Sequence, residues 1–461
     1  MSFDPHLAEF RFGHGLSPDI APPQSVGEML RGLTDTDDMA ERFEIEPFPV
    51  FRQRMVQRES LQKQFKKVRG TDEGKALQKQ IKLLKKDARQ DHYLWMTAQI
   101  LRATHSQTPF RERLQGFWAD HFTTAGKAGI ARRGVSPYVE TTIRPHMSGK
   151  FEDMLIAAVT HPLMVHYLDQ ERSAGPNSIR AQKKPGKYGL NENLAREILE
   201  LHTLGVGGPY TQNDVRELAE LLTGLTFKIN QGRHFQKALA EPGAETVLGK
   251  SYGGGQPHIR DIEAVLRDLA RHPATARHLA TKLAVHFVSD QPDPDLIGAV
   301  ETAWRDSDGD LSEVYRALLS HPAAWDPSVS NFKQPFDFIC SAARALAVHP
   351  RAIGNLSEKH ARQRLFEPLA LMGHIWQKPS GPDGLAEEDN AWITPQGMAV
   401  RLQWAVIVPR LLVGQLPDPR DFVDTALGPR ADETIRFAAA AAESRAEGVG
   451  LVLISPAFQR R

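Results

Sequence analysis

The sequence of 461 residues contains a single cysteine, Cys340. One thiol cannot form an internal disulfide, and it cannot supply the several thiolates of a cysteine zinc site. Cys340 lies within the apolar segment Phe338–Ala342, where a buried and unreactive thiol is expected. The chain therefore has no cysteine framework, and its stability must come from other residues.

The sequence also has almost no net charge and no long apolar run. Lys and Arg number 57 against 56 Asp and Glu, so no global field attracts the chain to nucleic acid or to an anionic membrane. No continuous apolar segment approaches the roughly 18 residues of a membrane-spanning helix. The N-terminus lacks the basic start and the apolar stretch of about 7 to 15 residues that an export signal requires. These absences predict a cytoplasmic protein.

Several familiar motifs are missing or incomplete. None of the 18 histidines follows an Asp or Glu by three positions, which excludes the Glu-x-x-His pair of di-iron bundles and the His-Glu-x-x-His zinc helix. The segment Gly249–Gly253 matches a nucleophile-elbow pattern, but the glycines and the proline after it cannot start the helix that this motif needs. The same segment misses the spacing of a phosphate-binding loop by one residue. No complete hydrolase or nucleotide motif remains.

Hydrophobic periodicity predicts an all-α protein of many helices. Helical spacing runs almost without interruption from Tyr93 to Leu225 and resumes at Ile259. Around 226–256 this period disappears among Gly, Pro, Asn and Gln, which predicts a small β hairpin or an irregular excursion. Four His-Pro pairs indicate helix corners, with Pro in the first turn of a new helix and the imidazole at the end of the preceding one. They begin at His161, His272, His321 and His349.

Composition divides the chain into three parts. Residues 1–50 are rich in Pro and Gly and then acidic, and they are expected to pack as an N-terminal segment on a larger body. Residues 51–92 are predicted to form a helical hairpin with a basic outer face, because 13 Lys and Arg stand against 5 Asp and Glu there. Residues 93–461 form the helical body, for which two lobes divided near 226–257 are one option. The basic face is interpreted as solvated, with a nucleic-acid or acidic-partner contact as the alternative.

The most specific segment is a predicted helix over residues 191–204. At about 100° per residue, Asn193, Arg196, Glu197 and Glu200 fall within an arc of about 100° beside an apolar stripe. Glu197 and Glu200, one turn apart, could hold a divalent metal, or divide acid and base roles if burial raised one pKa above the other. Arg196 and Asn193 would then orient an anionic or carbonyl-bearing substrate.

Residues from other helices could complete this site. His121, flanked by aromatic residues, is the candidate that would join Glu197 and Glu200 as a metal ligand, although a lone histidine of this kind is more often a hydrogen-bonded core residue. His202 projects about 160° from Glu200 and does not help. Further candidates are Asp169, Arg277 and Lys282. The sequence indicates no cofactor beyond this divalent metal and names no substrate.

The same side chains also have a structural explanation. Arg196 between acidic neighbours is a common way to tie helices together, and such networks perturb pKa values too. Two functions therefore stay open: an enzyme with its site on helix 191–204, and a non-catalytic partner or assembly protein that acts through the basic hairpin and the Pro-rich loops. A nucleic-acid-binding protein is the least supported, because net charge and a reading motif are missing.

Motifs dispersed along the chain together resemble one family. They are Phe10-Arg11-Phe12-Gly13, Phe117-Trp118 with His121-Phe122, Asn191–Leu201 with Thr203-Leu204-Gly205, His272-Pro273, Lys333 with Pro335, Met372-Gly373, Trp392-Ile393 and Leu453–Arg460. In this order, and over nearly the whole chain, the set is similar to the bacterial domain of unknown function 1800 (DUF 1800) family.

The resemblance implies a helical bacterial protein without an established activity. Many members are exported and are encoded beside members of the domain of unknown function 1501 (DUF 1501) family, which suggests a DUF 1501 partner and, as a second location, the periplasm. This chain departs from the family in lacking an export signal. It also has Ala240-Glu241 where the family tends to show His-Asp, and Gly384-Leu385 where Gly-Trp closes the proline-rich loop. Chemistry that depended on either feature would be altered here.

Overall fold

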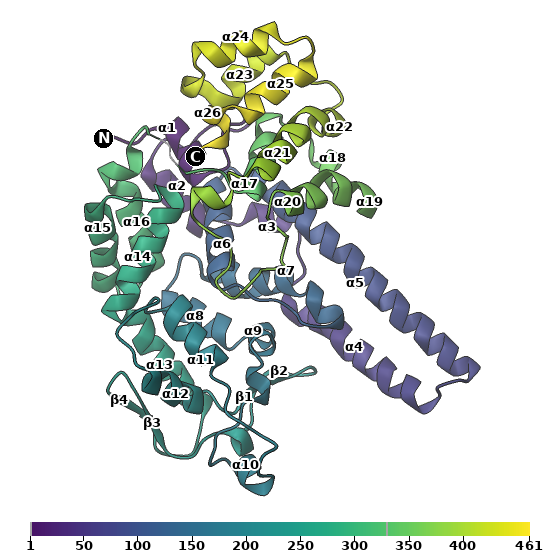
Figure 1. The fold of residues 1–461 in the computed structure, drawn as a ribbon, viewed down its shortest axis with the longest axis vertical. Helices are drawn as coiled ribbons and strands as arrows, with labels where there is room; N and C mark the ends of the chain where they lie inside the picture. The colour runs from purple at the N-terminus through teal and green to yellow at the C-terminus, as the bar shows by residue number, and fades with distance from the viewer. Residues whose placement is uncertain (1, 329–330) are drawn as a thin grey trace.

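The computed structural model describes residues 2–328 and 331–461, and helices dominate it (Figure 1). A body of many short helices carries one long hairpin that projects from it. The all-α prediction is confirmed. Within the described ranges, every helix is too short or too polar to cross a lipid bilayer.

Most helices are short because proline and capping side chains start a new one at frequent intervals. In the first half of the chain they are α1 (Pro5–Leu7), α2 (Val26–Thr34), α3 (Asp38–Arg42), α4 (Phe48–Lys67), α5 (Asp72–His105), α6 (Pro109–His121), α7 (Val135–Tyr138), α8 (Phe151–Val159), α9 (Pro162–Tyr167), α10 (Ile179–Lys183), α11 (Asn193–Glu197) and α12 (Gln212–Leu221). In the second half they are α13 (Ile259–Arg271), α14 (Pro273–Phe287), α15 (Pro294–Asp306), α16 (Leu311–Ser320), α17 (Pro335–Ala345), α18 (Pro350–Gly354), α19 (Glu358–Ala361), α20 (Glu367–Leu371), α21 (Pro395–Ile407), α22 (Pro409–Leu412), α23 (Pro419–Leu427), α24 (Glu433–Ala441), α25 (Arg445–Ile454) and α26 (Pro456–Gln459).

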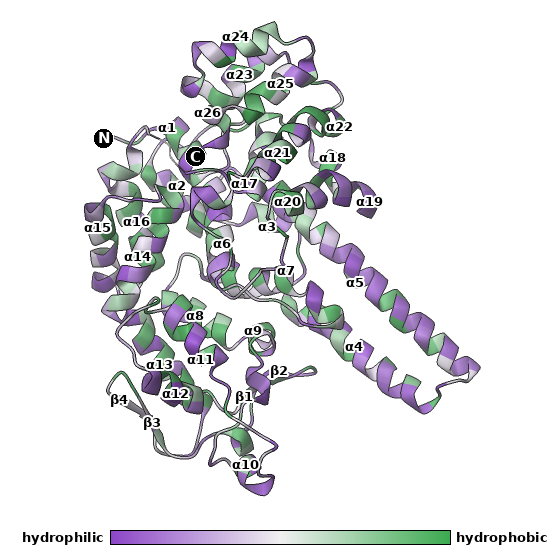
Figure 2. Cartoon of the chain, in the orientation of Figure 1, coloured by the Kyte–Doolittle hydropathy of each residue, from purple (hydrophilic) through white to green (hydrophobic). Residues whose placement is uncertain are grey.

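The basic segment consists of the long helices α4 and α5, which run side by side away from the body (Figure 1). Thr71 caps α5 by accepting a hydrogen bond from the N–H of Gly74. Leu77 and Ile81 are buried, whereas the lysines at 79, 82 and 86 are exposed. At 100° per residue these lysines lie on the side of α5 opposite the buried residues. In Figure 2 the ribbon of this pair is coloured mostly as hydrophilic residues.

Two small antiparallel sheets occupy the segment that was expected to leave the helical pattern. β1 (Leu225–Lys228) pairs with β2 (Gly232–Phe235), and β3 (Ala244–Val247) pairs with β4 (Lys250–Gly253). The predicted excursion at 226–256 is confirmed, as two hairpins. Leu248 and Gly249 turn the second one with φ angles of 51° and 76°, which a two-residue turn of type I′ requires.

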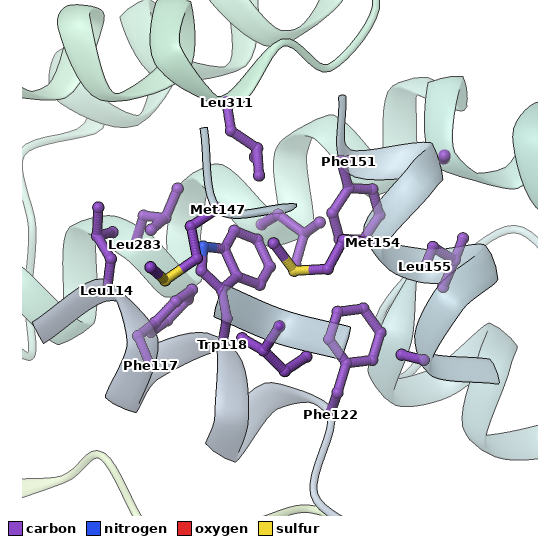
Figure 3. Close-up of a cluster of buried hydrophobic side chains, with 14 of the residues drawn as sticks. Leu114, Phe117, Trp118, Phe122, Met147, Phe151, Met154, Leu155, Leu283 and Leu311 are labelled. Carbon is purple, nitrogen blue, oxygen red and sulfur yellow. The ribbon is translucent and has the colours of Figure 1, made fainter. Parts of the chain in front are cut away.

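The larger hydrophobic cluster fixes the position of α6. Trp118 is fully buried, and its indole N–H donates to the hydroxyl of Tyr315 at 2.6 Å. Phe117, Phe122 and Phe151 pack around it (Figure 3). Burial of each such ring contributes on the order of 2 to 3 kcal/mol. This packing holds rigidly the helix that contributes most residues to the site described below.

A second buried cluster joins the C-terminal helices to α5. Met96 and Ile100 of α5 pack there with Phe338 of α17 and Trp404 of α21. Cys340 belongs to this cluster and is buried as predicted. The first cluster ends at residue 325, and the second, apart from its α5 residues, begins at residue 338. The division of the body into two lobes near residues 226–257 stays a prediction.

The four His-Pro pairs lie at helix corners, as predicted. In each pair the Nδ1 atom of the imidazole accepts the backbone N–H two residues further on, at 3.1 to 3.3 Å. The physical reason differs from the expected one, because an accepting nitrogen carries no proton. These histidines act as neutral caps of the following helix, not as cations at the end of the preceding one.

His272→Ala should therefore lower the free energy of unfolding by about 1 kcal/mol, because the N–H of Ala274 loses its acceptor. His272→Asn should keep most of the stability, since an amide oxygen also caps helices. Urea denaturation at pH 7.5 measures both variants. Equal losses in the two would contradict a capping role.

Candidate functional site

The predicted helix 191–204 consists of α11 and a following π-helical turn, η6 (Ile198–His202). Arg196 forms ion pairs with Glu200 at 3.1 Å and with Glu192 at 3.4 Å, and it also donates to the side-chain oxygen of Gln212. The Arg196 side chain is 40% exposed. These contacts form a surface network that ties α11 to the start of α12.

Two other predicted residues of this helix have different surroundings. Asn193 is exposed, and its backbone N–H donates to the side-chain oxygen of Asn191. Glu197 is half-buried, and burial, together with Glu200 and Asp383, raises its pKa. The surroundings of Glu197 thus disfavour its charged form.

His121 lies in a separate, basic neighbourhood. It is buried, its Nε2 donates to the carbonyl of His202 at 3.3 Å, and Lys282 Nζ lies 3.4 Å from its Nδ1. Burial first, and then the charge of Lys282, hold the pKa of His121 well below its usual value. Of the candidates from other helices, the structure therefore brings His121 and Lys282 together. The others form separate pairs, Asp169 with Lys127 and Arg277 with Glu301.

Carboxylates able to surround a cation lie elsewhere. Among the described residues, one group of three offers ligand atoms within 4.8 Å of one another, Glu217, Glu220 and Glu245. Burial and the neighbouring carboxylates raise the pKa of Glu245 to about 8. A proton held by Glu245 thus accounts for the proximity of these groups. A metal bound by the predicted set on α11 and α6 stays a prediction.

Loss of the Arg196–Glu200 ion pair should have a small effect. Glu200→Gln should change the free energy of unfolding by less than about 0.5 kcal/mol, because the pair is solvent-exposed. Glu197→Gln should leave stability unchanged or raise it at pH 8, since its surroundings disfavour the charged form. Urea denaturation at pH 8 measures both. A loss above about 2 kcal/mol in either variant would show that the side chain is a structural tie.

A cavity of about 160 Å³ lies beside α6, the helix that ends at His121. Its walls come from α5, α6, α14, the start of α17 and the loop over residues 374–387. Figure 1 shows this loop, drawn in yellow-green after α20, passing by α6 and α7. Segments far apart in the sequence thus meet around one polar space.

Asp337 is the electrostatic centre of one wall. Its carboxylate is bound by the guanidinium groups of Arg113 and Arg461, and the ring of His14 lies 3.7 Å away. Burial alone would raise the pKa of Asp337, but the two arginines hold it well below its usual value. Burial lowers the pKa of His14 to about 3, so this imidazole is neutral.

A hydrogen-bonded chain connects Arg113 to a second carboxylate. Glu387 accepts from His286 Nδ1 at 2.9 Å with both oxygens, and Arg113 lies 3.1 Å from His286 Nε2. Because a guanidinium only donates, Nε2 accepts and Nδ1 carries the proton. Burial favours the uncharged acid at Glu387, but His286 lowers its pKa overall. Glu387 is therefore ionised and fixed in place.

Asp120 lies on the same cavity but behaves in the opposite way. Both of its oxygens accept the backbone N–H of Leu385, at 3.0 and 3.1 Å. Burial raises the pKa of Asp120 to about 7, with Glu387 and Asp383 adding to the effect, while Leu385 and Lys282 oppose it. Glu387 is thus ionised, whereas the pKa of Asp120 lies near neutral pH.

Unsatisfied polar atoms concentrate at this cavity. Among the described residues, 22 buried side-chain nitrogen and oxygen atoms lack a hydrogen-bond partner, and eight of these belong to residues that line the cavity. Apart from Arg113 Nε, they belong to His14, Gln99, Thr124, His374, Trp376 and Gln377. A buried polar group without a partner costs roughly 1 to 3 kcal/mol. Because buried polar atoms are normally paired, this concentration makes the cavity the candidate site.

Sequence reasoning located the edge of this site and missed its centre. It selected His121, the neighbour of Asp120, and the motifs around Gly13, Lys333 and Gly373 lie within two residues of lining residues. Convergence of such dispersed motifs was the signal that could have found the cavity. Periodicity alone gives no distance between segments that are hundreds of residues apart.

One comparison with known proteins identifies a family. The sequence model described as "Protein of unknown function (DUF1800)" matches residues 11–460. No curated protein and no solved structure matches the chain.

Proposed function

The chain belongs to the DUF1800 family of proteins of unknown function, and we propose that it is an enzyme that performs acid–base chemistry on a small polar substrate in the cavity beside α6. Asp120 is the proton donor and acceptor, and Glu387 is the ionised carboxylate that stabilises positive charge or activates a hydroxyl group. The family itself supplies no activity, so the proposal rests on the site.

The observation that carries the proposal is the opposite ionisation of two carboxyl groups on one cavity. Burial raises the pKa of Asp120 to about 7, whereas His286 lowers that of Glu387. Environments that separate the pKa values of paired acids mark the acid and base of a catalytic site. A group with a pKa near the working pH is also the most effective proton-transfer catalyst.

The surrounding contacts favour preorganisation. The N–H of Leu385 fixes the Asp120 carboxyl, and His286 fixes both oxygens of Glu387. His286 is itself held by Arg113, which is bound to the buried Asp337. Groups whose rotamers are locked in this way lose little entropy when they react.

The helix selected from the sequence contributes no residue to the wall of this cavity, but it is linked electrostatically to Asp120 through Asp383. Asp383 interacts electrostatically with Glu197 as well as with Asp120, and Lys282 interacts with Asp120 while approaching His121. We assign Glu197 to the outer rim, where its half-buried carboxylate could guide a substrate. His121 and Lys282, which do not line the cavity, would then stabilise the ionised form of Asp120.

Untargeted metabolite profiling tests the proposal. Purified protein is incubated with a bacterial metabolite extract, and mass spectrometry follows compounds that disappear or form. The wild type should convert at least one compound, Asp120→Asn should slow this at least a hundredfold, and Asp87→Asn on the projecting hairpin should not. Conversion that Asp120→Asn leaves unchanged, or no conversion at all, would contradict the proposal.

A second function is favoured by one observation, the basic stripe on α5. Lys79, Lys82 and Lys86 are exposed on the outer side of the hairpin, and in the described part of the chain none of them has an ion pair. Such a stripe fits an acidic protein surface. A DUF 1501 protein, expected from the family resemblance, is the first partner to test for a non-catalytic assembly role.

Charge reversal separates this function from the enzymatic one. The triple variant Lys79→Glu, Lys82→Glu, Lys86→Glu should lose at least tenfold in affinity for a DUF 1501 protein encoded beside it, measured by calorimetry at 50 mM salt. The matched control Gln78→Glu, Gln90→Glu on the same helix should lose much less. Unchanged affinity in the triple variant, or no complex with the wild type, would exclude the partner role for the hairpin.

A further inference from the structure

We propose that the ligand of this cavity is a neutral polyhydroxylated molecule, a sugar or a related polyol, that binds between the side chains of Gln99, Thr124, Gln377 and Trp376. This inference deepens the proposed function, because it names the class of substrate for the same cavity. It rests on which polar groups of the wall are already paired and which are not.

The buried charged groups of the wall are bound to one another. Asp337 binds both Arg113 and Arg461, and Glu387 is bound by His286, whose other ring nitrogen lies 3.1 Å from Arg113. Glu112 is paired with Arg144 at 2.7 Å. An anionic or cationic ligand would have to break one of these buried pairs, which costs several kcal/mol. A neutral ligand leaves every pair intact.

The unpaired groups are neutral, and they are mixed in kind. Gln99 and Gln377 each present an amide oxygen that only accepts, whereas Trp376 presents an indole N–H that only donates. Thr124 contributes a hydroxyl group that can do both. His14 is a neutral imidazole with one donor and one acceptor nitrogen, neither of which has a partner. A ligand hydroxyl group donates and accepts at once, so several hydroxyl groups on one molecule match this set.

The amide orientation of Gln377 is fixed by the protein. Its Nε2 donates to the hydroxyl of Ser136 at 2.6 Å, so its unpartnered atom is the oxygen. This leaves an acceptor at a defined position, on the residue that follows Trp376 in the sequence. Alternating donors and acceptors at fixed positions discriminate between hydroxyl stereoisomers, because each misplaced hydroxyl group leaves a buried partner unsatisfied.

Aromatic rings supply the apolar part of the wall. Phe336 and Trp376 stack with their centroids 5.1 Å apart and an angle of 20° between the planes, and both line the cavity with Phe117. The C–H faces of a sugar ring are apolar and pack against such rings, while the hydroxyl groups at its edge reach polar partners. The cavity volume of about 160 Å³ fits a ligand of one ring.

Calorimetric titration of the wild type with defined probes tests the inference. The neutral probes are glucose, galactose, mannose, xylose, N-acetylglucosamine, myo-inositol and glycerol, and the charged probes are glucuronate, glucose 6-phosphate, glucosamine, acetate and phosphate. At least one neutral probe should bind saturably at one site per chain. Its charged counterpart should bind at least tenfold more weakly.

Two isosteric variants show where the probe binds. Gln99→Met and Thr124→Val each remove one unpaired polar atom, so each should weaken binding about tenfold, which equals about 1.4 kcal/mol. Neither should lower the melting temperature, because neither removes a hydrogen bond of that atom in the protein. Gln90→Met, an exposed position on the same helix, is the matched control and should change nothing.

Each outcome of these titrations either supports or overturns the inference. Binding of neutral probes that both variants weaken supports the inference. Binding of charged probes alone, weakened by the same variants, would overturn the ligand class and leave the cavity as the site of the enzyme. Binding that the variants do not affect, or no binding by any probe, would overturn the inference, and the metabolite profiling then decides separately whether an enzyme remains.

Discussion

Asp337→Asn should lower the free energy of unfolding by about 3 to 5 kcal/mol, the largest loss expected from any single polar substitution in this protein. Two buried arginines, Arg113 and Arg461, bind the Asp337 carboxylate and would keep their charge without it. Burial and Arg461 lower the pKa of Arg113 only to about 10, so it cannot escape the cost by releasing its proton at pH 7. Urea denaturation of the variant and the wild type at pH 7 measures the loss.

The pH dependence of this loss has a defined sign. The pKa of Asp337 is depressed in the folded protein, so its contribution is complete above the unfolded value near 4 and is lost as the pH falls toward the folded value. The difference between variant and wild type should therefore be as large at pH 5 as at pH 7. Asp424→Asn is the matched control, because its ion pair with Arg436 at 2.6 Å is exposed and should contribute little to stability. Equal losses in the two variants would contradict a buried charge centre.

Asp120→Asn should stabilise the protein at pH 8 and leave its stability unchanged at pH 4. The pKa of Asp120 rises from 3.8 to about 7 on folding, so the native state holds a proton that the unfolded state releases between these values. Stability is therefore lost as the pH rises through this window, by up to about 4 kcal/mol for a shift of roughly three units. Asparagine has no proton to lose, and its amide oxygen can still accept from Leu385.

Melting temperatures measured from pH 4 to pH 9 check this prediction. The curves of wild type and Asp120→Asn should coincide at the lowest pH and diverge between about pH 4 and pH 7, with the variant higher. Asp87→Asn, an exposed control, should follow the wild type throughout. A variant that is less stable at pH 8 would show that the Asp120 charge supports the fold. Retention of a group that costs stability at neutral pH is the behaviour expected of a catalytic residue.

Much of the fold could be predicted from local patterns. The break in helical period before Gly232 gave the position of the β hairpins, and the prolines after His161 and His272 gave the positions of helix corners. These signals are local, since each depends on residues within a few positions of one another. The role of the imidazoles as neutral caps needed the structure, because a sequence does not show which helix end a side chain faces.

The site could be predicted only at its border. The helical arc that selected Glu197 and Glu200 assumed 100° per residue, but Glu200 lies in a π-helical turn that winds differently. Asp120 looked like an ordinary polar residue beside His121, because its burial depends on Leu385, which lies 265 residues further on. Contacts over such separations are set by packing, and periodicity does not report them.

The central claim is that Asp120 holds a proton near neutral pH inside a cavity built to receive a ligand. Carbon-13 NMR of the aspartate carboxyl groups, with Asp120 assigned by comparison with Asp120→Asn, measures its titration directly in the folded protein. A midpoint near pH 7, shifted by a bound neutral sugar or polyol, is the predicted result. A midpoint near pH 4, unchanged by every ligand, would contradict the account.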